Sequence, residues 1–413
     1  MPEKAILHID FDSFFASVEQ QYDPNLRRKP VGVTAQNGRT CIIAASREAK
    51  KLGVKSPSRT FEALEKVPDM IFVPAHFEKY WEITQKFINI CKDFSPYIEL
   101  FSLDEVFIDI TQTEKLFGNK YQLIERIKER IRIEIGEYIT VSVGISYNKL
   151  LAKLASGMNK PNGMFEVTPQ NLDEVYAKTK LTDICGIGER IALRLNKIGV
   201  YSLIDLKKTS IAVLKAEFGN AESEFLKNVA LGIDDSKIVP YTESPVVKSV
   251  GRSYCLPQNE YDKRIILQNL YELCEEVSLK LRRLDKKART VGFYFGGSIK
   301  IQKRKTYTVY FDTGKEIFKH CLSLMENFDL TDNYIRQMSI WTSNFSSKDN
   351  LQMSLFDSSK ENKLIKAIDK LNNRFGNHTI RNGFLLYADR LTTVPNGYMA
   401  DKYERTKLAL SEF

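Results

Sequence analysis

The sequence has few of the residues that build disulfide frameworks or metal-thiolate sites. Its six cysteines are scattered through 413 residues, with no CxxC pair and no metal-type spacing to a histidine. Such a distribution is typical of small core residues in a reducing compartment, so we expect neither a disulfide scaffold nor a zinc site. The four histidines form no cluster in the sequence, and we expect them to be structural rather than catalytic.

Long hydrophobic runs are also absent. No apolar stretch approaches the roughly 20 residues that cross a bilayer, and neither the cationic nor the apolar region of a signal peptide follows Met1. The sequence therefore predicts a cytoplasmic protein without a membrane partner.

Positive charge is in excess. Lysine and arginine number 61 against 52 aspartates and glutamates, which gives a net charge of +9. This excess suits a polyanionic partner without requiring one, because a basic surface can also be simply solvated. The length indicates about two to four domains with ample core.

Two short segments place carboxylates at the ends of predicted strands. Asp10 ends the alternating apolar run in ILHIDFDSFFASVE (6–19), and Asp104 and Glu105 sit together in SLDEVFID (102–109). Successive side chains of a strand point to opposite faces, so Asp104 and Glu105 can converge only at a hairpin tip or a strand end. Taken singly, each acid is better explained as a strand-end or capping residue.

A cation is needed if the three carboxylates meet. Each pair would repel by roughly 4 kcal/mol at 4 Å and an effective dielectric near 20. Oxygen ligands with no nearby cysteine or histidine favour Mg²⁺ or Mn²⁺ over zinc. The two segments therefore predict a site for a hard divalent cation.

Strands and helices alternate up to residue 158. In order, the sequence predicts a strand at 5–11, a helix from Phe14 capped by Asp12 or Ser13, strands at 31–33 and 41–45, helices at 47–52 and 77–94, the hairpin with Asp104 and Glu105, a helix at 121–135, a strand at 140–146 and a helix at 150–158. This alternation is typical of a split β-α-β, ferredoxin-like sheet, which can carry a metal site at one end.

Residues 168–233 change to short helices. Within them, the segment ICGIGER joins a predicted helix at 181–184 to another at 190–198, which is a helix-hairpin-helix pattern. The two glycines, Gly186 and Gly188, would let the backbone approach a phosphate near a helix N-terminus. A plain glycine turn between packed helices is the alternative explanation.

A second domain follows a linker at 234–245. Its predicted elements are strands at 246–256, 290–296, 306–311 and 334–344 and helices at 263–284 and 315–328, in βαββαβ order, with basic residues bunched at strand edges. Beyond it lies a polar stretch at 346–360, in which QMSLF suggests a docking peptide, and then a predicted helix at 363–375.

Five segments carry a resemblance to a known family. They are HIDFDSFFASVE (8–19), AASREAKKLGV (44–54), SLDEVFID (102–109), VSVGISYNKLLAKLASGMNKPNG (141–163) and DICGIGER (183–190). Through them the chain resembles the Y-family translesion DNA polymerases, the bacterial UmuC and DinB group, from residue 5 to about 345.

The resemblance implies an α+β fold of the right-hand polymerase type. Its parts would be a ferredoxin-like palm (1–13 and 77–167), small fingers (14–76), a helical thumb with the helix-hairpin-helix (168–233), a linker (234–245), a separate βαββαβ little finger (246–345) and a C-terminal tail with a clamp-binding peptide (346–413).

The resemblance also implies a set of site residues. Asp10, Asp104 and Glu105 would be catalytic and would hold two Mg²⁺ ions, with Mn²⁺ as the alternative and the Phe11 carbonyl as a further ligand. The other implied residues are Phe14, Phe15, Arg47, Lys50 and Lys160 for the nucleotide, with Phe15 as the steric gate; Gly186, Gly188 and Arg190 for DNA; and Gln352, Ser354, Leu355 and Phe356 for the clamp.

The implied activity is error-prone, template-directed DNA synthesis across damaged DNA. The enzyme would transfer a nucleotide from a dNTP to a primer 3′-hydroxyl and release pyrophosphate, with primer-template DNA, dNTP, the sliding clamp (beta subunit) and accessory SOS proteins as partners. Small residues at the expected base pocket, Thr34, Ala44 and Ala45, imply tolerance of distorted base pairs.

Two other classes of protein remain open at this point. A nucleotidyl cyclase can use a similar sheet and paired metals, but it would need neither the glycine hairpin nor the second basic domain. A DNA-binding scaffold without activity would be expected to lack one of the three carboxylates, and all three are present.

Overall fold

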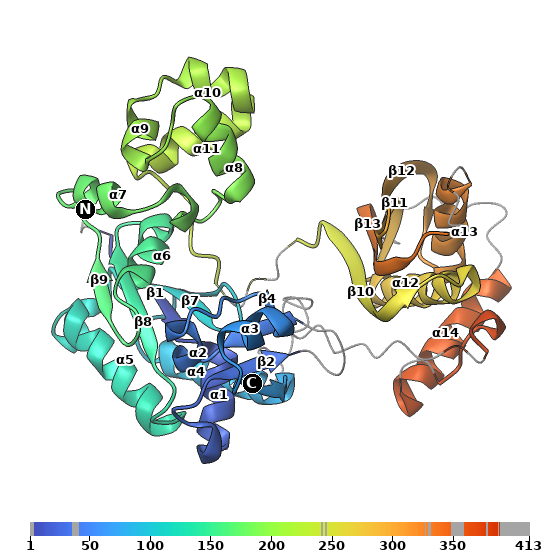
Figure 1. The fold of residues 1–413 in the computed structure, drawn as a ribbon, viewed down its shortest axis with the longest axis horizontal. Helices are drawn as coiled ribbons and strands as arrows, with labels where there is room; N and C mark the ends of the chain where they lie inside the picture. Colours follow the sequence, from blue (N-terminus) through green and yellow to red (C-terminus); the bar gives the residue numbers. More distant parts are fainter. Residues whose placement is uncertain are drawn as a thin grey trace. The chain divides into compact units, whose positions relative to one another are not determined.

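The computed structural model describes residues 4–34, 41–240, 243, 246–326, 328, 332–347, 359–376, 379–386 and 388. These residues form two compact units, one ending at 243 and the other beginning at 246 (Figure 1). None of the helices in the described ranges is both long enough and apolar enough to cross a membrane.

The first unit is built on a five-stranded sheet. Its strand order is β6 (Ile98–Leu100), β7 (Glu105–Asp109), β1 (Ile6–Phe11), β8 (Val141–Ser146), β9 (Met164–Glu166). Strand β1 is antiparallel to both β7 and β8, while β8 and β9 are parallel. The first four strands have the ferredoxin-like order, as the sequence predicts.

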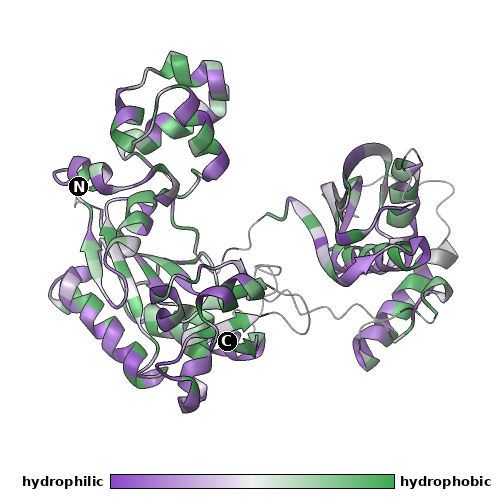
Figure 2. Ribbon diagram, in the orientation of Figure 1, coloured by the Kyte–Doolittle hydropathy of each residue, from purple (hydrophilic) through white to green (hydrophobic). Residues whose placement is uncertain are grey.

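The two faces of this sheet differ in character. Leu7, Ile9 and Phe11 of β1 are buried in a core that also contains side chains of α4 (Phe77–Lys92) and α5 (Lys120–Glu134). Figure 2 shows green and purple alternating along α5, as expected for a helix with one buried face. Because side chains alternate along a strand, His8 and Asp10 lie on the opposite face, which α6 (Lys149–Met158) covers in part.

Gly144 of β8 lets α6 lie directly against the sheet. A Cβ atom built on Gly144 would be 1.9 Å from the carbonyl oxygen of Ala152 and 2.3 Å from the backbone nitrogen of Ser156. No other residue fits there without moving the helix. This close approach brings the α6 side chains Lys153 and Ser156 to the same face as His8.

A small second sheet forms beside the first. Its order is β4 (Ser58–Arg59), β3 (Cys41–Ala45), β2 (Val31–Thr34), β5 (Ile71–Pro74). The accompanying helices are α1 (Phe14–Tyr22), η1 (Pro24–Leu26), α2 (Arg47–Lys51) and α3 (Thr60–Lys66). Ile42, Ala49 and Val54 belong to a separate small core at this sheet.

A helical region follows β9. Its helices are α7 (Leu172–Lys178), η3 (Leu181–Asp183), α8 (Glu189–Lys197), α9 (Leu203–Lys208), α10 (Ile211–Phe218) and α11 (Asn220–Leu231). One further short helix of this unit, η2 (Glu114–Phe117), lies earlier in the chain, before α5. The predicted helix at 181–184 is wrong in type, because these residues form a single 3₁₀ turn before the glycines.

The second unit has the predicted βαββαβ chain order. Its elements are β10 (Ser249–Glu260), α12 (Lys263–Arg283), β11 (Lys286–Gly297), β12 (Lys300–Phe311), α13 (Gly314–Met325) and β13 (Ile335–Ser347). The sheet order is β10-β13-β11-β12, so the first and last strands of the unit pair with each other. In this unit the last strand, β13, lies between β10 and β11, whereas in the first sheet the first strand, β1, lies between β7 and β8, so the two strand orders differ.

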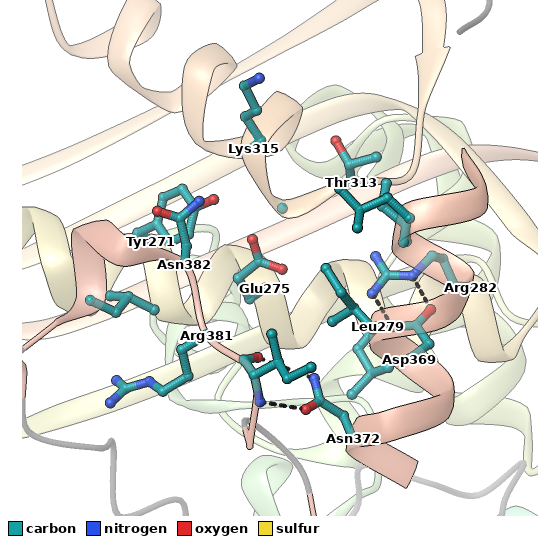
Figure 3. Close-up of a pocket in the computed structure, with 16 residues that line it drawn as sticks. Tyr271, Glu275, Leu279, Arg282, Thr313, Lys315, Asp369, Asn372, Arg381 and Asn382 are labelled. Carbon is teal, nitrogen blue, oxygen red and sulfur yellow. Dashed lines mark hydrogen bonds and ion pairs between the residues drawn. The ribbon is translucent and has the colours of Figure 1, made fainter. Parts of the chain in front are cut away.

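A C-terminal segment packs on the helical side of the second unit. It contains α14 (Ser359–Phe375) and η5 (Gly383–Leu385). Arg282 of α12 donates to both carboxylate oxygens of Asp369 at 2.7 and 2.8 Å, at the wall of a pocket that α12, α13 and this segment enclose (Figure 3). Arg381 donates to Glu272 at 3.0 Å, and Leu385 is buried.

The pair of Arg381 and Glu272 should stabilise the second unit. Glu272 has a side chain only 3 % exposed, so Arg381→Met would leave a buried carboxylate without this cation. We expect a loss of about 3 kcal/mol in the free energy of unfolding, measured by denaturant titration of the full chain. Adding Glu272→Gln should restore most of it.

Arg374→Met provides a matched control, because Arg374 lies exposed on α14. Equal stability of the Arg374→Met and Arg381→Met variants would show that the pair of Arg381 and Glu272 does not stabilise this unit.

Candidate active site

Asp10 and Glu105 are neighbours on adjacent strands of the first sheet. They are directly paired in the antiparallel register of β1 and β7. One ligand atom from each of His8, Asp10 and Glu105 lies within 4.8 Å of the others. The two predicted segments are therefore brought together at one end of the central strand.

Asp104 sits at the hairpin between β6 and β7, as predicted. Its carbonyl oxygen accepts the Phe11 N–H at 2.9 Å, and its carboxylate accepts the Ser102 hydroxyl at 2.5 Å. The N–H groups of Phe101 and Ser102 both donate to the Glu105 carbonyl and close the turn. Asp104 is thus adjacent to the other two carboxylates, although its side chain is bonded to Ser102.

Two lysines neutralise charge at this cluster. The Lys160 ammonium lies 2.8 Å from Asp10 Oδ2, and the Lys153 ammonium bonds Glu105 Oε2. Lys160 was predicted from the sequence as a phosphate-binding residue. Lys153 was not predicted, because nothing in the spacing of helix α6 indicates which turn faces the carboxylates.

The environments of the three carboxylates differ. Burial raises the pKa of Asp10, against the opposing charge of Lys160, and burial likewise raises the pKa of Asp104. Burial alone would raise the pKa of Glu105 too, but the His8 hydrogen bond and the Lys153 charge outweigh it and lower that pKa to about 2. The surroundings therefore favour the ionised form of Glu105 and disfavour the ionised forms of Asp10 and Asp104.

His8 contradicts the expectation that no histidine lies near the carboxylates. It is fully buried, with Nε2 2.9 Å from Glu105 Oε2 and Nδ1 2.7 Å from the Ser156 hydroxyl. These bonds fix the imidazole and orient Glu105. Strand alternation could have revealed it, since His8 is two residues before Asp10 and shares its face.

The predicted cap of helix α1 by Asp12 or Ser13 is wrong. Ser13 adopts a left-handed conformation (φ 55°) and makes no side-chain cap. The buried Asp12 carboxylate instead accepts hydrogen bonds from the hydroxyls of Thr140 and Ser142, each at 2.7 Å, and from the Asn162 N–H at 2.8 Å. It ties the end of β1 to β8 and to the loop that carries Lys160.

Phe14 and Phe15 are about equally buried, at 4 % and 5 % exposure. Phe14 stacks on Phe11 with ring centroids 4.8 Å apart, and Phe15 stacks on Tyr80 at 4.3 Å. Burial therefore does not distinguish a core aromatic from a steric gate, and the assignment of Phe15 stays a prediction.

The predicted phosphate-binding residues Arg47 and Lys50 lie on α2, which Ser46 caps. Arg47 Nη2 donates to the Thr140 hydroxyl at 2.7 Å and to the Tyr138 carbonyl at 3.2 Å. The pKa of Lys50 is lowered, first by burial and then by the charge of Lys160. The side chains of Arg47 and Lys160 are therefore close enough to Lys50 for their charges to interact with it.

The small residues of the expected base pocket are not all available. Ala45 is fully buried in the core of the second sheet, which contradicts its placement in that pocket, whereas Thr34 and Ala44 are partly exposed. A buried side chain packs against the sheet rather than a ligand.

The predicted DNA-binding residues belong to the helical region that follows β9. Gly186 has φ 100°, a conformation that favours glycine, and its Cβ position would be 2.4 Å from Phe225. Gly188 and Arg190 are exposed at the start of α8. Gln352, Ser354, Leu355 and Phe356 of the clamp peptide lie outside the described residues.

Comparison with known proteins assigns the chain to a family. The model of the impB/mucB/samB family matches residues 9–157, and that of the family's C-terminal domain matches residues 247–355. The chain belongs to this family, the Y-family DNA polymerases. The first matched region lies within the first compact unit and the second within the second unit, and the first region contains every carboxylate of the cluster.

Individual relatives agree with the family. DNA polymerase IV of Desulfatibacillum aliphaticivorans is 31 % identical over 387 residues, which cover 92 % of this chain and 96 % of that relative. DNA polymerase IV of Halorhodospira halophila is 36 % identical over 292 residues, covering 70 % and 80 %. A solved Y-family DNA polymerase chimera, Dbh-Dpo4(243-245)-Dbh, aligns with 83 % of this Y-family chain and all of its own at a TM-score of 0.70 and 25 % identity.

The carboxylates should affect the stability of the metal-free polymerase in opposite directions. Folding raises the pKa of Asp10 and of Asp104, so Asp10→Asn and Asp104→Asn should each raise the Tm at pH 7 in EDTA. The pKa of Glu105 is lowered to about 2, so its ionised form is stabilised above pH 4.5, and Glu105→Gln should lower the Tm. Each kcal/mol corresponds to roughly 2–4 °C in calorimetry.

Added Mg²⁺ should raise the Tm of the unsubstituted chain but not that of Asp10→Asn. The gain should fade as pH falls, because protons compete for Asp10. Asp69→Asn, at an exposed position, is the control and should change neither value. A lower Tm for Asp10→Asn in EDTA would mean that the ion pair with Lys160 stabilises the fold, contrary to this account.

Proposed function

We propose that this Y-family polymerase synthesises DNA across damaged template bases, with low fidelity, by a two-metal transfer of a nucleotide from dNTP to a primer 3′-hydroxyl. The observation that carries the proposal is the direct pairing of Asp10 with Glu105, beside Asp104, in a chain of this family. Relatives named DNA polymerase IV support it over nearly their whole length.

The residues of the cluster suit a hard divalent cation. Asp10 and Asp104 are partly buried carboxylates with raised pKa values, so positive charge beyond the two lysines would stabilise their ionised forms. Oxygen donors favour Mg²⁺, with Mn²⁺ as the alternative, and the His8 nitrogen is already bonded to Glu105. Asp10, Asp104, Glu105 and the Phe11 carbonyl would hold two ions.

Each part of the cluster would then have a separate task. Bound metal ions would activate the primer hydroxyl and neutralise the leaving pyrophosphate. His8 and Lys153 keep Glu105 ionised and oriented, while Lys160, which pairs with Asp10, would leave it for an incoming phosphate. No side chain here is assigned as a general base.

Basic groups would bind the substrates. Arg47, Lys50 and Lys160 would contact the triphosphate, and the backbone at Gly186 and Gly188, with Arg190, would contact a DNA phosphate. The second unit adds exposed basic side chains along β12, namely Lys300, Lys303, Arg304 and Lys305. Binding of primed DNA should therefore weaken steeply with salt.

Further partners follow from the sequence. Gln352, Ser354, Leu355 and Phe356 would dock on the sliding clamp, and accessory SOS proteins would act on the enzyme. The cysteines of the described residues are free, which agrees with a cytoplasmic location.

Primer extension on templates with an abasic site or a bulky adduct tests the function. With Mg²⁺ and dNTPs the unsubstituted chain should extend past the lesion, and Asp104→Ala should lose at least about a thousandfold in rate, as expected when charge neutralisation is removed. Deleting residues 352–356 should leave basal extension intact and abolish stimulation by the clamp.

Incubation with dATP alone is the control for a cyclase activity and should give no product. Failure to extend any primed template, or full activity of Asp104→Ala, would contradict the proposal, and equal clamp stimulation of the deletion variant would contradict the docking peptide.

Sugar discrimination tests Phe15. Phe15→Ala should raise incorporation of ribonucleotides relative to deoxynucleotides by tenfold or more, because an open space replaces the ring under the sugar. Phe14→Ala is the matched control, since Phe14 is equally buried but stacks on Phe11. An unchanged ratio for Phe15→Ala in single-nucleotide insertion assays would refute the steric gate.

A further inference from the structure

A chain of polar contacts connects the two regions that carry the phosphate-binding residues. It begins at the buried Asp12 carboxylate, two residues beyond Asp10. Asp12 Oδ2 accepts the Asn162 N–H at 2.8 Å and the Thr140 hydroxyl at 2.7 Å, while Oδ1 accepts the Ser142 hydroxyl. One carboxylate oxygen thus serves both the loop of Lys160 and the side chain of Thr140.

Thr140 continues the chain to Arg47. Arginine can only donate and an ionised carboxylate can only accept, so the single hydroxyl hydrogen of Thr140 points to Asp12 and its oxygen accepts from Arg47 Nη2 at 2.7 Å. Both bonds therefore involve a charged group, which makes them stronger than ordinary hydrogen bonds. The direction of this relay is fixed by its chemistry.

The described hydrogen bonds of the Arg47 guanidinium involve a single nitrogen, Nη2. Nη2 makes both of its described hydrogen bonds, to Thr140 and to the Tyr138 carbonyl, and the ring of Tyr138 lies 6.0 Å away. Arg47 Nε is buried and has no acceptor among the described residues. The protein alone thus fixes the position of the guanidinium without supplying all of its acceptors.

We propose that Thr140, anchored by Asp12, is a positioning residue that fixes Arg47 at a set spacing from Lys160 for binding of the dNTP triphosphate. The inference rests on the proposed function and assigns to Asp12 and Thr140 a role that is separate from metal binding. Arg47 lies on α2 and Lys160 in the loop after α6, so without the relay their spacing would depend on two independent segments.

The relay predicts a defined kinetic signature. Thr140→Val keeps the shape of the side chain and removes the hydroxyl, so Arg47 loses its anchor. We expect the KM for dNTP to rise about tenfold, with kcat changed less than about twofold, because binding to the triphosphate is weakened in the ground state and the transition state alike. Thr140→Ser keeps the hydroxyl and should restore wild-type values.

Ser142→Ala is the matched control. It also removes one hydroxyl from the Asp12 carboxylate, but this hydroxyl has no contact with Arg47. Both variants should lower the Tm by similar amounts, whereas only Thr140→Val should weaken nucleotide binding. The Kd of dNTP for the enzyme on a dideoxy-terminated primer gives this comparison without any chemical step.

A double-mutant cycle makes the assignment specific. In an Arg47→Met background, Thr140→Val should change the Kd less than about twofold, since the residue that it positions is gone. Equal effects of Thr140→Val and Ser142→Ala, or an undiminished effect of Thr140→Val without Arg47, would overturn the relay. If the unsubstituted chain fails to extend a primer, the proposed function fails first, and the relay assignment fails with it.

Discussion

The structure depends on the crowding of negative charge at one end of strand β1. Asp10 and Glu105 are paired in register, Asp104 adjoins them in the hairpin, and Asp12 follows two residues later. In a partly buried setting these charges repel unless cations offset them. The contacts around them are explained by this need, since lysines, an imidazole and hydroxyls converge there from four different segments.

The four carboxylates differ in how far neighbouring groups stabilise their negative charge. Protein donors hold Asp12 at both carboxylate oxygens and Glu105 at Oε2, which fixes both side chains in place. Asp10 and Asp104 have raised pKa values because burial outweighs the groups around them. Such a site is suited to bind a cation. A bound cation would favour the ionised forms of Asp10 and Asp104, while Glu105 and Asp12 would not have to move.

Local patterns were enough to predict β1, α4 and the carboxylate hairpin, but β4, α3, β5 and β9 were not predicted. Apolar alternation predicted β1, helical spacing predicted α4, and the adjacency of Asp104 and Glu105 predicted a turn at this point. Local patterns could not predict how these elements pack against one another. Lys153 and Ser156 reach the site only because Gly144 lets α6 lie against the sheet, and no local pattern states which helix will use that space.

Asp12 shows why capping rules failed at this position. Its sequence context favours an N-cap, but a buried carboxylate gains more from three donors, namely Thr140 just before β8, Ser142 in β8 and Asn162 in the loop after α6, than from one helix N–H. His8 was missed for a different reason, because its role becomes visible only when β7 is paired with β1. The roles of Asp12 and His8 are therefore determined by contacts between distant segments of the chain rather than by local helix or capping propensity.

The most direct measurement is anomalous diffraction from crystals of the chain with primed DNA, an incoming nucleotide and Mn²⁺. This account predicts Mn²⁺ peaks between Asp10 and Glu105, at about 2.0–2.2 Å from carboxylate oxygens, as is usual for small divalent ions. It also predicts that the ammonium of Lys160 has left Asp10. Peaks only at other positions, with the pair of Asp10 and Lys160 unchanged, would contradict it.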